Sequence, residues 1–257
     1  MRADFESQYH RVESDHWWFA GRRDLLSNLL RDAGAGRSSR ILDVGCSGGA
    51  TIRRLRREGY ADVVGIDLSP EAIARCRRAG LQDVHEMDAQ RPEFPDQSFD
   101  VILASDILEH VPDEAAAVRA WFRLLRPDGL LVALVPAFMA LWSPHDEANQ
   151  HRKRYRLGEL RRCLEECGFE TKRASYWNFL LFLPAALIRA LQRLVPPLGR
   201  SHPDLRVPAA FVNALLAAVL FGENRLLRAG ISWPWGLSAL VVARRPGTAA
   251  AVGPHHP

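Results

Sequence analysis

Residues 41–49 read ILDVGCSGG, and residues 65–67 read GID. The first stretch predicts a buried strand that breaks into a glycine turn and opens a helix, and the second predicts a strand that ends in a carboxylate. Backbone without side chains lets a ligand approach closely, and the start of the helix presents unpaired N–H groups. An acid at the tip of the second strand, Asp67, can accept both hydroxyls of a ribose. Together these features predict a nucleoside-binding site.

The acid at the start of the turn, Asp43, narrows the choice of ligand. A carboxylate there repels a pyrophosphate, so it opposes a dinucleotide. A ligand that carries an ammonium and a sulfonium is attracted instead. The glycine turn alone leaves another kind of nucleotide-binding fold open as the alternative.

The pattern Asp-x-Gly-x-(Gly)-x-Gly, with a second acid 24 positions after the first, resembles the class I S-adenosylmethionine-dependent methyltransferases. Ser47 stands where that family usually has its middle glycine. A serine is compatible with the turn if its φ is negative, so we expect a negative φ at Ser47. The resemblance implies a Rossmann-like fold and S-adenosylmethionine as the cofactor.

Three further stretches extend the resemblance, which covers residues 38–136 well and the rest more loosely. Residues 87–89 resemble the family's third-strand acid, residues 94–100 and 108–111 the flanks of its fourth strand, and residues 125–129 the turn before its fifth, with Asp128 where glycine is more usual. By resemblance, Asp43 and Gly45 hold the methionine end, Asp67 the ribose, and Asp88 with Ala89 the base. Taken singly, Asp88 is equally consistent with a helix cap. The expected cofactor-binding residues are Asp43, Gly45, Cys46, Gly49, Asp67, Leu68, Asp88, Ala89 and Ser105.

The length of 257 residues permits one large α/β domain with an insertion, or two small domains. A net charge of +4 is mild, and residues after the expected fourth strand lack an Asn/Asp-Pro-Pro-aromatic motif, so we expect no nucleic-acid partner. The four cysteines form no Cys-x-x-Cys pair and no His/Cys cluster. We therefore expect no metal site, no disulfide framework and a reducing, cytoplasmic location.

Alternating strand and helix patterns predict a doubly wound, mostly parallel, seven-stranded α/β sheet. It carries an N-terminal helical cap and an apolar helical insert before the last strand. The expected strands are 40–44, 63–67, 83–86, 99–104, 130–136, 169–176 and 237–244. The expected units are a cap (1–36), a cofactor-binding core with a substrate loop (37–177), the insert (178–236), the last strand (237–245) and a disordered tail (246–257).

Residues 137–155 are predicted to form a long loop without secondary structure that leaves the carboxyl end of the fifth strand, where ligands bind in such sheets. His145, Asp146 and His151 offer proton acceptors, and these three with Tyr155 are the candidate catalytic residues. Arg152 and Arg154, with Tyr155, are candidate substrate-binding residues for an anionic acceptor. The alternative is a solvated basic loop before a helix.

A second unusual cluster, His16-Trp17-Trp18-Phe19 with Arg22 and Arg23, has two interpretations. It forms either a lid, with Trp17 and Arg22 binding substrate, or a helix pinned to the sheet by its large rings. Together with the His-Asp…His-Arg-x-Arg-Tyr loop it resembles a bacterial methyltransferase subgroup, many of whose members serve glycolipid, polysaccharide or isoprenoid pathways.

The apolar helical insert (178–236) gives information about the acceptor. Leu187, Ile188, Leu191 and Leu194 form one apolar face, and residues 209–221 are apolar all round except Asn213. Core packing is the favoured interpretation; a homodimer interface, an acceptor channel and peripheral membrane contact are the alternatives. Residues 179–188 and 207–221 each fall short of the roughly 18 residues that span a bilayer, and no signal peptide is expected at the polar N-terminus.

The sequence thus predicts in-line methyl transfer from S-adenosylmethionine to a small or lipid-like, anionic acceptor. A non-catalytic cofactor-binding module and a nicotinamide-dependent oxidoreductase are the alternatives. The sequence leaves open the acceptor, the atom methylated, and whether a base is needed and which residue supplies it.

Overall fold

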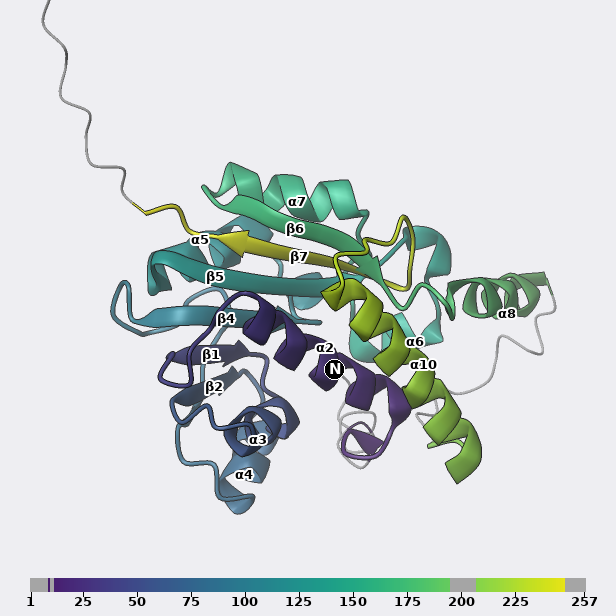
Figure 1. Cartoon of the computed structure of the whole chain (residues 1–257), viewed down its shortest axis with the longest axis horizontal. Coiled ribbons are helices and arrows are strands. Elements are labelled where there is room, and N and C mark those ends of the chain that lie inside the picture. The colour runs from purple at the N-terminus through teal and green to yellow at the C-terminus, as the bar shows by residue number, and fades with distance from the viewer. Residues whose placement is uncertain (1–8, 10–11, 195–206, 248–257) are drawn as a thin grey trace, which may run out of the picture.

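A computed structural model describes residues 9, 12–194 and 207–247 (Figure 1). Most of the predicted tail lies outside these residues. Seven strands form one sheet in the order β3-β2-β1-β4-β5-β7-β6, and β7 is antiparallel to both of its neighbours. The strands are β1 (Ile41–Val44), β2 (Val63–Asp67), β3 (Val84–Glu86), β4 (Phe99–Ser105), β5 (Leu125–Pro136), β6 (Glu170–Trp177) and β7 (Ser238–Arg244). The predicted α/β fold is confirmed.

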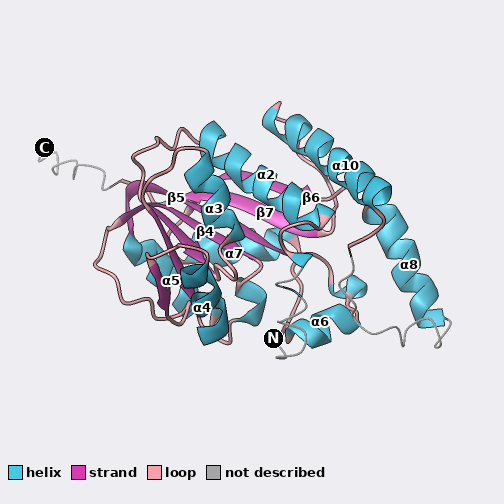
Figure 2. Ribbon diagram, turned by 90° about the horizontal axis from the view of Figure 1, so that it is seen from below, coloured by secondary structure: helices cyan, strands magenta, loops and turns pink. Residues whose placement is uncertain are grey.

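Helices cover both faces of the sheet (Figure 2). One face packs against α2 (Trp17–Asp32), α3 (Ala50–Arg57), α4 (Pro70–Arg78) and α10 (Ala210–Arg228). The opposite face packs against α5 (Glu114–Leu124) and α7 (Leu157–Glu166). Because both faces are covered, all four residues of β1 are buried, as expected of a central parallel strand.

Local signals at helix starts act as the sequence indicates. Ser69 caps α4, since its hydroxyl accepts from the Ala72 N–H at 3.2 Å, and Pro70 and Glu71 follow in the first turn. Asp113 caps α5 by accepting from the Ala116 N–H at 2.9 Å. Both helices begin at the edge of the sheet where β2 and β4 end. Their caps therefore fix the positions of the loops that connect these strands to the helices.

The prediction of a negative φ at Ser47 is wrong. Ser47 has φ 50°, and Gly45 and Gly49 in the same turn have φ 72° and 74°. This left-handed conformation turns the Ser47 N–H toward the Asp67 carboxylate, which accepts it at 2.9 Å. Gly49 has no room for a side chain, because a Cβ there would lie 2.3 Å from Leu81 Cδ1.

The segment after β5 differs from the predicted structureless loop. It contains the short 3-10 helix η2 (Met139–Leu141) and the helix α6 (Pro144–Asn149). Asp146 starts α6 by accepting from the Ser143 N–H at 2.8 Å, a capping box that the sequence analysis did not identify. The turn at Asp128 lies inside β5, and Asp128 takes φ 64°, the conformation that glycine provides more easily.

The insert consists of α8 (Phe182–Leu194), which projects beyond the sheet, and α10, which lies along α2 (Figure 1). Asn213, the polar residue of the apolar run, accepts from the Trp17 N–H at 2.9 Å and so ties α10 to α2. Leu220 and Leu227 are buried, but Phe211 is 78% exposed and Leu187 of α8 is 60% exposed. The expectation that core packing accounts for these apolar residues is therefore wrong for the first half of α10.

The expectation about helix length is also corrected. At 19 residues, α10 is long and apolar enough to cross a membrane by length and composition, and 22% of its most apolar window is buried. The arginines Arg225 and Arg228 continue the helix beyond the apolar run, which is why the sequence alone suggested a shorter segment.

We predict that Asn224→Ala lowers the free energy of unfolding by about 2–4 kcal/mol. Buried Asn224 accepts from Trp177 Nε1 at 2.8 Å and donates to the Gly21 carbonyl at 2.9 Å, so its loss leaves both groups unpaired. Urea denaturation checks this, with Leu226→Ala on the exposed side of the same helix as the control. Equal losses in the two variants would contradict it.

Candidate functional site

The site lies beyond the carboxyl ends of β1, β2, β4 and β5. The sheet order reverses between β1 and β4, and ligands bind at such a switch point in open α/β sheets. The parallel register aligns Asp43 of β1 with Gly65 of β2 and Leu103 of β4, so that the turns after these strands meet at one edge.

Asp43 is buried without a complete set of partners. It is 5% exposed, and within the described part of the chain its Oδ2 has no hydrogen-bond partner. Burial raises the pKa of Asp43 to about 7, although the Arg22 guanidinium opposes this shift. A buried carboxylate oxygen without a partner is costly unless a ligand pairs with it, so Asp43 fits the ammonium group of an amino acid moiety.

Asp67 organises the turn beside it. Its two oxygens accept from the Ser47 N–H and the Ser69 N–H, each at 2.9 Å. The next residue, Leu68, leaves its large apolar side chain uncovered. Cys46 packs underneath, where a Cβ on Gly65 would lie 2.8 Å from its sulfur.

Asp88 is not a helix cap, because it lies in a loop and its Oδ1 accepts from the Gln90 N–H at 2.8 Å. Its neighbour Ala89 uses its carbonyl to accept from Trp121 Nε1 at 2.9 Å. The sequence analysis missed Glu13, which accepts from the Ser47 hydroxyl at 3.4 Å and so lies against the glycine turn. No local motif marks Glu13, since it is 34 residues away along the chain.

The end of β4 carries an ion pair that was also missed. Arg22 donates to Asp106 at 2.7 Å, and the Ser105 hydroxyl donates to the same carboxylate oxygen at 3.1 Å. The Arg22 guanidinium also lies 4.8 Å from the ring centroid of Trp18. Arg22 is thus buried and engaged by Asp106, and it does not line the neighbouring cavity.

A cavity of about 470 Å³ lies next to this ion pair. Aromatic and titratable side chains form one part of its wall, and apolar residues of α8 and α10 form another. The polar and aromatic residues include His16, Trp17, Trp18, Asp106, His110, His145, His151, Arg154 and Arg189, and the apolar residues include Leu181, Ile188 and Leu216.

Asp146 organises the polar wall although it is fully buried. It accepts from His151 Nδ1 at 2.8 Å and from Arg154 Nε and Nη2 at 2.8 and 2.9 Å. Burial by itself raises the pKa of Asp146, but the hydrogen bonds from His151 and Arg154 outweigh burial and hold the pKa well below its ordinary value. Asp146 is therefore an ionised anchor for two side chains that line the cavity.

The other residues predicted for this site separate into two groups. His145 lines the cavity, and burial lowers its pKa to about 4, which keeps the imidazole neutral at pH 7. Tyr155 lies in the apolar core and donates to the Leu108 carbonyl at 3.2 Å, and Arg152 is exposed. Neither Tyr155 nor Arg152 is part of the cavity wall.

The structure adds Glu109 and His110, which belong to η1 (Leu108–His110) after β4. Burial raises the pKa of Glu109 well above its ordinary value and lowers the pKa of His110 to about 3. Both residues stand in the stretch 108–111, which the sequence analysis matched only as the exit from a strand. Their closeness to His151 depends on the path of the chain after β5.

Comparisons with known proteins agree with this geometry. A family model described as a methyltransferase domain matches residues 15–173. A ubiquinone biosynthesis O-methyltransferase of Neisseria meningitidis serogroup C is 38% identical over 142 residues, which cover 49% of this chain and 58% of that protein. One of Xanthomonas oryzae pv. oryzae is 37% identical over 148 residues, covering 48% and 60%. The match thus spans less than two thirds of the length of these curated relatives.

Solved structures share the fold at low sequence identity. A SAM-dependent methyltransferase from Thermotoga maritima superposes with a TM-score of 0.58 at 17% identity, covering 95% of this chain and all of that one. One from Mesorhizobium loti gives 0.52 at 22% identity, covering 81% and 91%. With the acids at the strand ends and the family model over more than half of its length, the chain belongs to the S-adenosylmethionine-dependent methyltransferases.

Proposed function

We propose that this protein transfers a methyl group from S-adenosylmethionine to an oxygen atom of an isoprenoid-type acceptor that also carries an anionic group. The observation that carries the proposal is the cavity beside the cofactor-binding edge, with a polar wall at one end and apolar helices at the other. A sulfonium is already a good leaving group, so positioning the acceptor in line supplies much of the rate.

The geometry of the strand ends supports the cofactor roles that belong to this proposal. Asp43, with its unpartnered oxygen, pairs with the ammonium group, and the turn from Gly45 to Gly49 follows the methionine moiety. Asp67 accepts from the ribose hydroxyls beside Ser47 and Ser69. Leu68, Asp88 and the Ala89 N–H serve the base, and Ser105 borders the methionine end through the carboxylate of Asp106.

The acceptor lies in the cavity with its reactive end toward the histidines. His151 presents the ring edge that Asp146 does not hold, and Arg154 and Arg189 supply positive charge for an anionic group. His151 is the group that meets the acceptor hydroxyl, whereas Asp146 positions it. Tyr155 and Arg152 do not line the cavity, so they do not contact the acceptor and can affect it only by supporting the surrounding structure. Arg22 likewise affects the site by holding Asp106, which lines the cavity.

The apolar tail of the acceptor leaves between α8 and α10. Ile188 of α8 and Leu216 of α10 line the cavity, and neighbouring residues of both helices, such as Leu187 and Leu215, are exposed. These exposed apolar residues support peripheral contact with a membrane that holds the tail, with a homodimer interface as the alternative.

We expect Asp67→Ala to weaken binding of S-adenosylhomocysteine by tenfold or more. A hydrogen bond to a charged group contributes about 1.5–3 kcal/mol, and the variant loses the hydrogen bonds between the Asp67 carboxylate and the ribose hydroxyls. Isothermal calorimetry measures the affinity, with Asp62→Ala, an exposed acid before β2, as the control. Unchanged affinity in Asp67→Ala would remove Asp67 from the cofactor site.

Cofactor binding should also depend on pH through Asp43. Its carboxyl gains a proton as the pH falls below about 7 and then no longer attracts an ammonium group. We expect the affinity for S-adenosylhomocysteine to fall about tenfold between pH 7.5 and 5.5. Asp43→Asn should bind weakly at both pH values, with a much smaller change between them. An identical pH dependence in the variant would contradict the assignment.

The acceptor is tested with a matched pair, a dihydroxybenzoate that bears a farnesyl chain and the same dihydroxybenzoate without it, in which the carboxylate is the anionic group. We expect formation of S-adenosylhomocysteine with the prenylated compound at a KM at least tenfold lower, because the tail fills the apolar part of the cavity. Ile188→Trp should raise that KM and leave cofactor affinity unchanged, while Leu187→Trp, outside the cavity wall, should do neither. No turnover of either compound by protein that binds the cofactor would overturn this acceptor class.

A further inference from the structure

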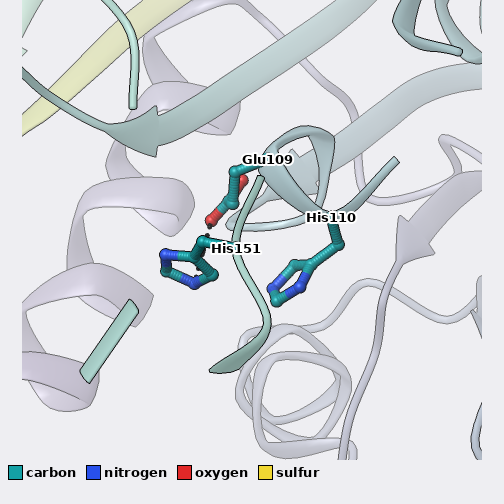
Figure 3. A group of neighbouring side chains, drawn as sticks. All are labelled: Glu109, His110 and His151. Atoms are coloured by element: carbon teal, nitrogen blue, oxygen red, sulfur yellow. Dashed lines mark ion pairs between the residues drawn. The ribbon is translucent and has the colours of Figure 1, made fainter. Parts of the chain in front are cut away.

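Three potential metal ligands converge at the polar end of the cavity. Glu109 and His110 come from η1, and His151 comes from the segment after α6 (Figure 3). One ligand atom from each residue can be chosen so that all three lie within 4.8 Å of one another. No cysteine takes part, so the cysteine-based expectation of no metal site did not consider this arrangement.

Glu109 provides an independent sign that something is missing. Its side chain is 1% exposed, and neither carboxylate oxygen has a hydrogen-bond partner among the described residues. Figure 3 shows the carboxylate directed at the His151 ring. A buried carboxylate without hydrogen-bond partners is costly. A cation between Glu109 and the imidazoles would pair with one or both of the Glu109 oxygens.

The two imidazoles are already oriented as metal ligands usually are. His151 Nδ1 is held by the Asp146 carboxylate at 2.8 Å, which leaves Nε2 directed toward Glu109 Oε1 at 3.9 Å. The His110 ring has a hydrogen bond to the backbone of Gln150. A carboxylate or backbone group behind each ligating histidine is the common outer arrangement of metal sites.

The spacing suits a small divalent ion. Two ligand atoms that each lie about 2.0–2.2 Å from one tetrahedral ion are about 3.4 Å apart. The observed 3.9 Å between His151 Nε2 and Glu109 Oε1 needs a shift of roughly half an ångström. The three ligand atoms together lie within 4.8 Å, so binding would also draw the residues closer around the ion. Two nitrogens and one oxygen favour zinc or a similar transition metal over magnesium or calcium, which prefer oxygen ligands.

We propose that Glu109, His110 and His151 bind one divalent transition-metal ion of the zinc type. His110 and His151 also line the cavity, so the remaining coordination positions face it. If the proposed function is correct, His151 would meet the acceptor through the ion rather than directly, and the ion would supply a Lewis acid that lowers the pKa of the acceptor hydroxyl. The rival explanation is that Glu109 is simply protonated and needs no ion.

The test uses the full chain, freed of metal by dialysis against EDTA, without cofactor or acceptor. Calorimetric titration with Zn²⁺, and with Co²⁺ followed by visible absorption, should give one ion per chain. Glu109→Gln keeps the shape of a protonated carboxyl but cannot supply a carboxylate, so it should weaken binding at least tenfold, and so should His110→Ala. His85→Ala, a surface histidine paired with Asp83, should bind as the wild type does.

Either of two results would overturn the proposal: no stoichiometric binding by the wild type, or equal affinity in Glu109→Gln and the wild type. If Glu109→Gln does not fold, His110→Ala decides by the same comparison. Binding of S-adenosylhomocysteine by each variant is measured separately and should be retained. Loss of metal binding alone thus leaves the cofactor assignment intact, and loss of cofactor binding alone leaves the metal site intact.

Discussion

The polar end of the cavity depends on one buried carboxylate, that of Asp146. It starts α6 through Ser143, and it holds His151 and Arg154 by charge-assisted hydrogen bonds between 2.8 and 2.9 Å. Ionised groups are rarely buried unless they are paired, and here the pairing fixes the direction of both partners. The Arg152 N–H, which donates to the Glu109 carbonyl at 2.8 Å, and the Tyr155 hydroxyl, which donates to the Leu108 carbonyl, hold the same segment against the end of β4.

Short-range features of this chain were predictable from sequence. The strand, the glycine turn and the acids Asp43 and Asp67 follow from apolar runs and turn residues, and Ser69-Pro70 marks a helix start because capping needs only neighbouring residues. The same reasoning failed at Ser47, whose φ is set by a hydrogen bond to Asp67, twenty residues away. Positive φ at a non-glycine residue depends on such a contact and leaves no local signature.

Side-chain roles were harder to predict than backbone elements. Tyr155 and Arg154 are neighbours in an aromatic and basic run, yet one lies in the core and the other lines the cavity. The alternation of side chains is fixed by the isolated bridge between Ala137 and Tyr155, which a single sequence does not reveal. The apolar composition of α10 is equally consistent with a core helix, an interface helix and a lipid-contacting helix. Only the structure shows that one end of α10 is buried and the other is exposed.

Buried acids in this protein fall into two kinds, and the difference bears on where ligands bind. Asp146 has its oxygens fully engaged by protein donors and serves the structure. Asp43 and Glu109 keep oxygens without partners, and burial raises the pKa of both. Folding tolerates such groups only if other interactions offset their cost or a ligand removes it. Asp43 belongs to β1 and Glu109 to η1, which follows β4, and there a cationic amino acid moiety and a metal ion would each supply the missing charge.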